Sequence, residues 1–181
     1  MRKLILIVAL LLVVGPAAAK ETRTELARPP TPDDAKPNSD AVPDGYAIDS
    51  QFERVVILRF KYQTDLLEGL RSMVKKDNIR NAVILSGIGS VRGYGLHTVS
   101  NRTFPSKDIF RSDPDAPADL VSMNGYVIDG RVHAHMTLAN PDKAFGGHLE
   151  PGTQVFTFVI VTLGVLDDKA DLSRVDDQRY R

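Results

Sequence analysis

Two runs rich in β-branched and apolar residues, Leu120–Ile128 and Arg131–Leu138, are joined by only two residues, Asp129 and Gly130. An Asp-Gly pair between such runs is typical of a β-hairpin, because the tight turn needs residues that tolerate positive φ. Successive side chains of a strand point to opposite faces, so His133 and His135 share one face. The sequence therefore predicts a hairpin that projects two imidazoles together.

The rest of the folded region contains one helix among about six strands. A stripe of apolar residues at helical spacing runs from Leu66 to Val74 and predicts a helix with one face packed on a sheet. Asn78 is expected to end it. Strands are expected at 53–60, 81–86, 94–99, 120–128, 131–138 and 154–163, the last apolar on both faces. Residues 100–118 are expected to form a surface loop. This pattern predicts an α+β fold, mainly antiparallel.

A third histidine, His148, follows the hairpin after a turn that Asn140-Pro141-Asp142 would begin and Gly146-Gly147 would close. Three neutral imidazoles bind Zn²⁺ well, and three histidines with an open fourth position form a known catalytic arrangement. The sequence thus makes His133, His135 and His148 candidate metal ligands, with zinc the favoured ion. The alternative is that the three rings hydrogen-bond one another and the backbone at a contact between subunits.

Other residues of the predicted domain are weaker candidates for a functional site. Glu150 and Asp142 are the nearest carboxylates and could orient a ligand imidazole, and Glu150 is also a candidate general base. The fourth histidine, His97, lies on another expected strand, and its pattern favours a surface or hydrogen-bonded residue over a fourth ligand. The glycines between Gly87 and Gly95 do not match G-x-G-x-x-G, so we expect a turn or bulge there rather than a dinucleotide site.

The ends of the chain differ in composition from the middle. Residues 1–19 have the charged, apolar and small-residue parts of a secretory signal, with cleavage expected after Ala19 and export to the periplasm or medium. An uncleaved membrane anchor is the alternative. Residues 20–49 are polar and proline-rich and are expected to form a disordered linker. Residues 50–167 form the predicted domain, and residues 168–181 the C-terminal tail.

Composition excludes several classes of function. The chain of 181 residues has no cysteine, which rules out disulfides and thiolate chemistry. Its formal net charge is zero and it lacks a basic cluster, so nucleic acid is not an expected partner.

Four segments in order, 64–68, 79–90, 129–135 and 146–153, resemble the PPC domain of plants and prokaryotes. The resemblance covers about residues 52–166 and implies an antiparallel α+β fold that assembles as a homotrimer. It also implies metal binding in bacterial members through the histidines that correspond to His133, His135 and His148. The AT-hook core Arg-Gly-Arg-Pro, through which plant relatives contact DNA, is missing, so DNA binding is not expected to transfer.

Two functions follow as hypotheses. The first is an exported, oligomeric binding or scaffold domain with a three-histidine metal site, whose partners are further copies of itself and a protein or small-molecule ligand. The alternative is a metal-dependent enzyme of the hydrolase or lyase type, acting on a small molecule with Glu150 as general base.

Overall fold

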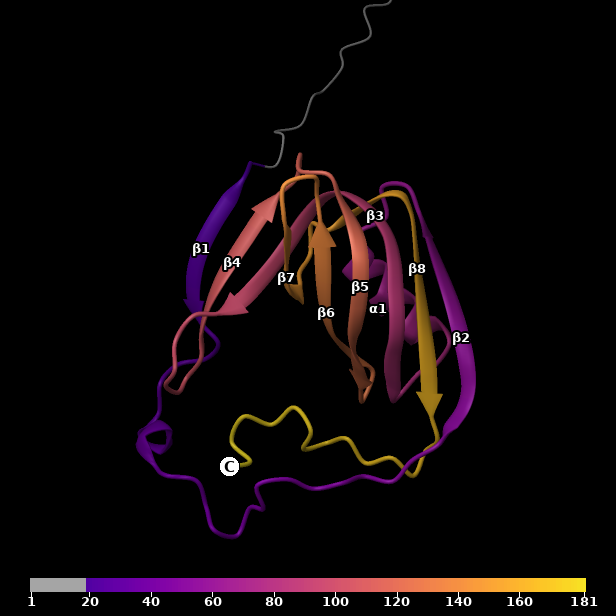
Figure 1. Ribbon diagram of the computed structural model, residues 1–181. Helices are drawn as coiled ribbons and strands as arrows, with labels where there is room; N and C mark the ends of the chain where they lie inside the picture. Colours follow the sequence, from indigo (N-terminus) through magenta and orange to yellow (C-terminus); the bar gives the residue numbers. More distant parts are fainter. Residues whose placement is uncertain (1–18) are drawn as a thin grey trace, which may run out of the picture.

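The computed structural model describes residues 19–181 of the chain (Figure 1). Apart from Ala19, the predicted signal lies outside the described residues. Within them, no helix is both long enough and apolar enough to cross a membrane.

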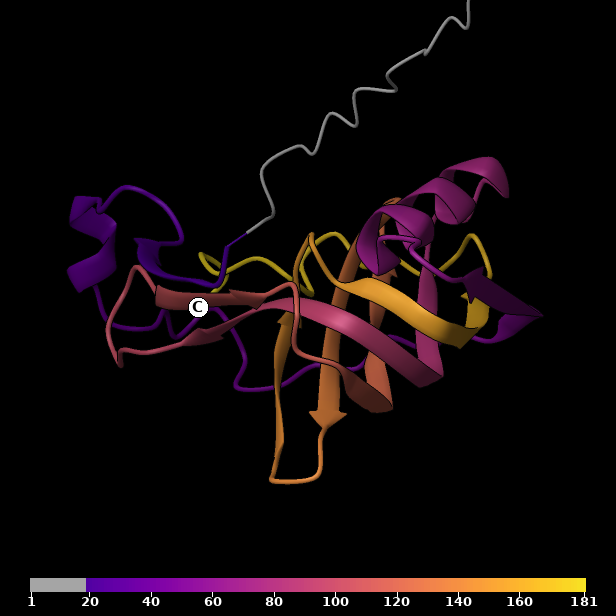
Figure 2. The same cartoon turned by 90° about the horizontal axis from the view of Figure 1, so that it is seen from above.

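In residues 19–181, eight antiparallel strands form one strongly curved sheet, and a single α-helix covers one of its faces (Figures 1 and 2). The elements are β1 (Glu21–Leu26), the 3₁₀-helix η1 (Pro32–Ala35), β2 (Phe52–Lys61), α1 (Leu66–Lys76), β3 (Ala82–Val99), β4 (Lys107–Asp113), β5 (Ala118–Ile128), β6 (Arg131–Ala139), β7 (Ala144–Leu149) and β8 (Gln154–Leu166). The predicted α+β class, mainly antiparallel with one principal helix, is confirmed.

Helix α1 forms where the apolar stripe predicted it. The carboxylate of Asp65 caps its first turn by accepting a hydrogen bond from the Glu68 amide at 3.1 Å. Beyond the last turn Asn78 has φ 50°, the left-handed conformation that commonly ends a helix. Leu66, Leu67, Leu70 and Val74 are buried against the sheet, where Leu58 and Phe60 of β2 meet them. The core therefore lies between α1 and the concave face of β2, β8 and β3.

Strands β5 and β6 form the predicted hairpin. Asp129 and Gly130 both have positive φ, 50° and 78°, as the tight turn requires. The register pairs Tyr126 with His133 and Asn124 with His135, so the two imidazoles lie on one face as expected.

The prediction of two separate strands at 81–86 and 94–99 is wrong, because both are halves of strand β3. The structure instead has one continuous strand of 18 residues, in which Gly89 and Gly93 border bulges. A Cβ at Gly89 would lie 2.1 Å from the carbonyl oxygen of Phe158, so this position requires glycine. The first half of β3 pairs with β5 and β8, and the second half leaves them to pair with β4 and β7.

Strands β4 and β1 also differ from the expectations. β4 lies inside the segment expected as a loop, and β1 lies inside the segment expected as a disordered linker. β4 pairs with the far half of β3 and β1 pairs with β4, giving an arm that projects from the body of the fold (Figure 2). Every residue of β1 is exposed, so backbone pairing and not an apolar face defines this strand.

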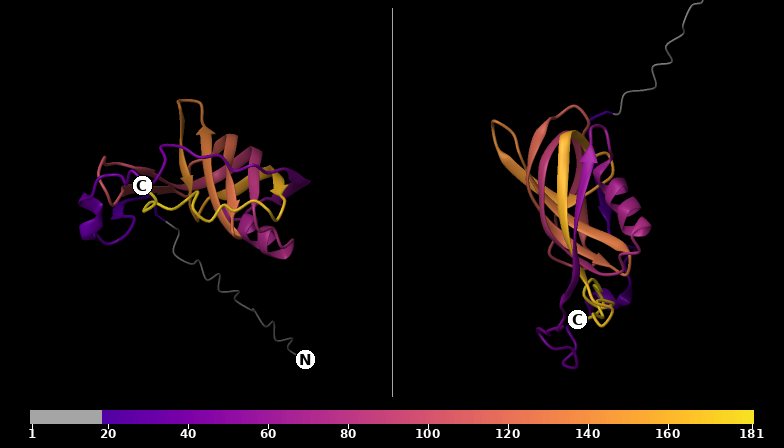
Figure 3. Two further views of the ribbon diagram at one scale, coloured as in Figure 1. Left: turned by 90° about the horizontal axis from the view of Figure 1, so that it is seen from below. Right: turned by 90° about the vertical axis from the view of Figure 1, so that its right-hand side faces the viewer.

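The C-terminal tail has turns but no helix or strand, and it is docked rather than frayed. Ala170 and Leu172 are only 2% and 7% exposed, and the Asn81 side chain donates a hydrogen bond to the Ala170 carbonyl at 2.9 Å. At its end, Arg181 donates to the carbonyls of Asp33 and Lys36, both at 2.8 Å. Tail and N-terminal segment thus meet at the same end of the molecule (Figure 3).

Candidate metal centre

Strand pairing brings all four histidines of the chain to one face of the sheet. Near its end, β7 lies between β3 and β6, and His148 is directly opposite His97 on one side and His135 on the other. Directly opposed residues of antiparallel strands share a face. His133 shares that face because it precedes His135 by two residues. Sequence reasoning had expected three of these histidines to converge, and the structure adds His97.

The three predicted ligands, His133, His135 and His148, form a nearly equilateral triangle. Their ring centroids are 5.3, 5.0 and 5.2 Å apart, and the Nε2 atoms of His133 and His135 are 3.3 Å apart. Two nitrogens bound to a tetrahedral zinc at about 2.0–2.1 Å are separated by about 3.3 to 3.4 Å. The Nε2 spacing of His133 and His135 therefore fits two ligands of one ion of this size, and the His148 ring lies beside both.

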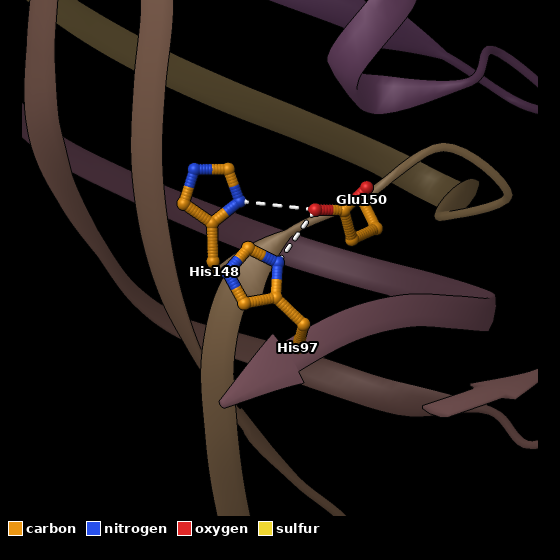
Figure 4. Close-up of side chains that lie close together, drawn as sticks. All are labelled: His97, His148 and Glu150. Atoms are coloured by element: carbon orange, nitrogen blue, oxygen red, sulfur yellow. Dashed lines mark hydrogen bonds and ion pairs between the residues drawn. The ribbon is translucent and has the colours of Figure 1, made fainter. Parts of the chain in front are cut away.

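Glu150 lies behind His148, on the side of its Nδ1. One carboxylate oxygen, Oε1, is 3.3 Å from His148 Nδ1 and 2.7 Å from His97 Nδ1 (Figure 4). The other ring nitrogen of His148 points away from Glu150. His148 Nδ1 is buried and makes no hydrogen bond of ordinary geometry, although Oε1 lies 3.3 Å from it. A carboxylate at Nδ1 leaves Nε2 as the nitrogen for a metal.

His97 offers a second way to assemble a ligand set. One potential ligand atom from each of His97, His148 and Glu150 lies within 4.8 Å of the other two. The 2.7 Å between His97 Nδ1 and Glu150 Oε1 is a hydrogen-bond distance, however, and two ligands so close would narrow their angle at a zinc ion to about 80°. His97 also stacks on the His148 ring at 4.5 Å and 22°. These contacts favour a supporting role for His97.

Burial and neighbouring rings shift two pKa values at this site. Burial lowers the pKa of His135, and the nearby His148 and His133 lower it further. Burial acts to raise the pKa of Glu150, but the contacts of its carboxylate with the imidazoles of His148 and His97 outweigh burial, so that pKa is lowered overall. His135 is therefore held neutral and Glu150 charged near neutral pH, the forms that a ligand and its supporting carboxylate need.

The two carboxylates singled out from the sequence are placed differently. Oε1 of Glu150 faces Nδ1 atoms, on the opposite side of His148 from its free nitrogen, which favours orientation of the ring over proton transfer. Asp142 lies in the β6–β7 turn, and in the part of the chain that the structure describes it forms no ion pair with a histidine.

Fold and site together define a class: antiparallel α+β domains with a cluster of imidazoles on one face of the sheet. Residues 48–167 match the model of the Plants and Prokaryotes Conserved (PCC) domain, and the chain belongs to this family. The resemblance seen in the sequence is thereby confirmed. A search of the curated proteins found no match.

Solved structures of the same fold come from archaea and bacteria. A PPC protein of Pyrococcus horikoshii is 28% identical, with a TM-score of 0.55, over 66% of this chain and 82% of that one. A metal-containing protein of Archaeoglobus fulgidus is 22% identical, with a TM-score of 0.55, over 70% and 89%. A Bacteroides thetaiotaomicron protein provisionally described as DNA-binding is 18% identical, with a TM-score of 0.52, over 65% and 83%. The last two show the fold alone.

Proposed function

We propose that this PCC domain is an oligomeric binding module that holds one divalent transition metal ion per chain, with zinc the favoured ion. The ligands are the Nε2 atoms of His133, His135 and His148. The triangle of ring centroids near 5 Å carries this proposal, because it is the spacing that three imidazoles adopt around one ion. The Archaeoglobus fulgidus protein of the same fold is described as metal-containing, which supports the proposal.

The chain's own residues determine what such a site does. Glu150 fixes the His148 ring, and His97 holds Glu150 in place through the 2.7 Å contact. The side chain of His133 is 39% exposed, so a ligand from solution reaches this edge of the site. When bound, a divalent ion supplies an electrophilic centre for an anionic or carbonyl group. We therefore expect the module to recognise a small ligand of that kind.

Catalysis by a metal-dependent hydrolase or lyase is the second candidate function, and the solvent exposure of His133 favours it. Such catalysis also needs a general base beside the ion. Glu150 is the predicted base, but its Oε1 is engaged by two Nδ1 atoms. We therefore place binding before catalysis.

The proposed oligomer is a homotrimer. It rests on an exposed apolar face of the sheet, on the side opposite α1. The side chains exposed there are Val55, Ile57, Ile88, Phe156 and Phe158. An apolar face of this extent is typical of an interface between subunits.

Two further parts of the proposal concern partners and location. DNA binding is not proposed, because the chain has a formal net charge of zero and the neighbour described as DNA-binding is only 18% identical. Export is proposed from the sequence of residues 1–19 alone.

Metal content of the chain purified without chelator tests the proposal. We expect about one zinc, iron or nickel ion per chain by mass spectrometry, and none in the double variant His133→Ala/His135→Ala or in His148→Ala. The matched control is His97→Ala, which should retain the ion because His97 is not a ligand. If the parent chain takes up no metal after incubation with zinc, the proposal is wrong.

A further inference from the structure

The C-terminal tail places a carboxylate against one of the proposed ligands. Oδ1 of Asp176 lies 3.3 Å from Nδ1 of His133, and Oδ2 lies 3.4 Å from Nη1 of Arg131. Asp176 comes after residue 167, where the match to the PCC family ends. The contact therefore joins the family domain to a segment that lies beyond it.

The geometry at His133 parallels the geometry at His148. In each case a carboxylate oxygen lies 3.3 Å from Nδ1, which leaves Nε2 as the ring nitrogen without a carboxylate. A carboxylate at Nδ1 favours the tautomer with the proton on that atom, so the lone pair is on Nε2. The Nε2 of His133 is the atom that lies 3.3 Å from the Nε2 of His135.

The tail is anchored on both sides of Asp176. Before it, Ala170 and Leu172 are buried, and Ala170 accepts the hydrogen bond from Asn81. After it, Tyr180 meets Tyr46 edge to face at 5.8 Å between ring centroids, and Arg181 is held by backbone carbonyls of the N-terminal segment. The tail runs past the end of the sheet where β5 and β6 meet (Figure 1). Its path thus fixes Asp176 beside β6.

Arg131 gives the carboxylate a second partner. The Arg131 side chain is 68% exposed, whereas the Asp176 side chain is only 25% exposed. Arg131 balances the charge of the Asp176 carboxylate through Oδ2, so Oδ1 stays available to His133. Oδ1 is therefore directed to the imidazole.

We infer that Asp176 is a positioning residue of the metal site, which fixes the tautomer and orientation of His133 from the C-terminal tail. This inference rests on the proposed function for its metal-dependent consequence. Its effect on the tautomer of His133 exists in the metal-free chain as well.

Two measurements on the full chain test the inference. In the metal-free protein, ¹H–¹⁵N correlation spectra of the imidazoles should show His133 protonated at Nδ1, and Asp176→Ala should shift it toward the Nε2–H form. In zinc competition titrations, Asp176→Ala should bind about 10- to 100-fold more weakly than the parent, the usual loss when a supporting carboxylate is removed. Asp176→Asn keeps an acceptor oxygen, so it should retain much of the Nδ1-protonated form of His133 and much of the zinc affinity of the parent. Asp168→Ala, an exposed tail residue, is the matched control and should behave as the parent.

The possible outcomes separate the two claims. A parent chain that binds no zinc overturns both the proposed function and the role of Asp176 in metal binding. A parent that binds zinc, with Asp176→Ala unchanged in affinity and in the His133 tautomer, overturns the inference alone. An equal loss in Asp168→Ala would show that the tail acts only by docking and would also overturn it.

Discussion

One oxygen atom, Oε1 of Glu150, lies beside two imidazoles and explains much of the local chemistry. It lies 2.7 Å from His97 and 3.3 Å from His148, and these contacts outweigh the effect of burial on the carboxyl pKa. A charged carboxylate at this point favours a proton on the Nδ1 of each ring. The residues that orient the proposed ligand His148 thus include His97, which contacts it through the same carboxylate.

The protonation of His135 gives a prediction at the residue scale. Burial and the neighbouring rings lower its pKa below the ordinary 6.5, so the neutral form persists to lower pH than in a free imidazole. In the metal-free chain, an NMR titration should place the midpoint of His135 below 6.5. His148→Gln should move the midpoint of His135 back upward, because the electrostatic effect of the His148 ring on His135 is lost.

The same shift has a consequence for stability. The folded state binds a proton at His135 less readily than the unfolded state does. The free energy of unfolding is therefore highest, as far as His135 is concerned, above pH 6.5, and it decreases as the pH falls through the lowered pKa. A midpoint for His135 at or above 6.5 in the folded chain would contradict this account.

At the scale of elements, β7 depends on the absence of a side chain at Gly147. A Cβ there would lie 2.4 Å from the carbonyl oxygen of His97 on β3. Gly147→Ala should therefore push β7 away from β3 and lower the free energy of unfolding by about 1–3 kcal/mol, the usual cost of overpacking. It should also weaken metal binding, because His148 is the next residue. Chemical denaturation and zinc titration are the measurements.

The control for this prediction is Gly45→Ala. Nothing lies within 4 Å of a Cβ at Gly45, and its φ is not positive. This variant should unfold as the parent does. If Gly147→Ala were as stable as Gly45→Ala, the close contact between β7 and β3 would be wrong.

The elements that sequence reasoning predicted are those encoded by neighbouring residues. The β5–β6 hairpin follows from Asp129 and Gly130, and α1 from its apolar stripe and Asn78, so the common face of His133 and His135 followed as well. These features need only local turn chemistry and periodicity.

The parts that were missed depend on pairing between distant segments. β1 and β4 have no buried apolar face comparable to that of β8, so their patterns resemble a linker and a loop. His97 joins the site only because β3 is long enough to reach β7, and Asp176 only because the tail is anchored at both sides. Such long-range contacts leave no signal in a short window of sequence.

At the scale of the whole molecule, the uncovered apolar face predicts self-association. Ile57 is 71% exposed on β2, and Phe158 on β8 is 39% exposed on the same face. We expect the parent to sediment as a trimer and Ile57→Asp to dissociate toward monomers, because a charge would be buried at the interface. Sedimentation velocity measures this directly.

Val99 provides the control for self-association. It is 65% exposed, but it lies at the end of β3 on the arm and away from that face. Val99→Asp should sediment as the parent does. A parent chain that is monomeric at micromolar concentration would contradict the proposed assembly.

In the proposed metal site, three imidazoles hold the ion, and the group of His97, His148 and Glu150 does not. Anomalous diffraction at the zinc edge from crystals of the loaded chain tests it most directly. We expect one peak per chain about 2.0–2.1 Å from the Nε2 atoms of His133, His135 and His148, with Glu150 outside coordination distance. A peak coordinated by His97 and Glu150, or no peak in crystals soaked with zinc, would contradict it.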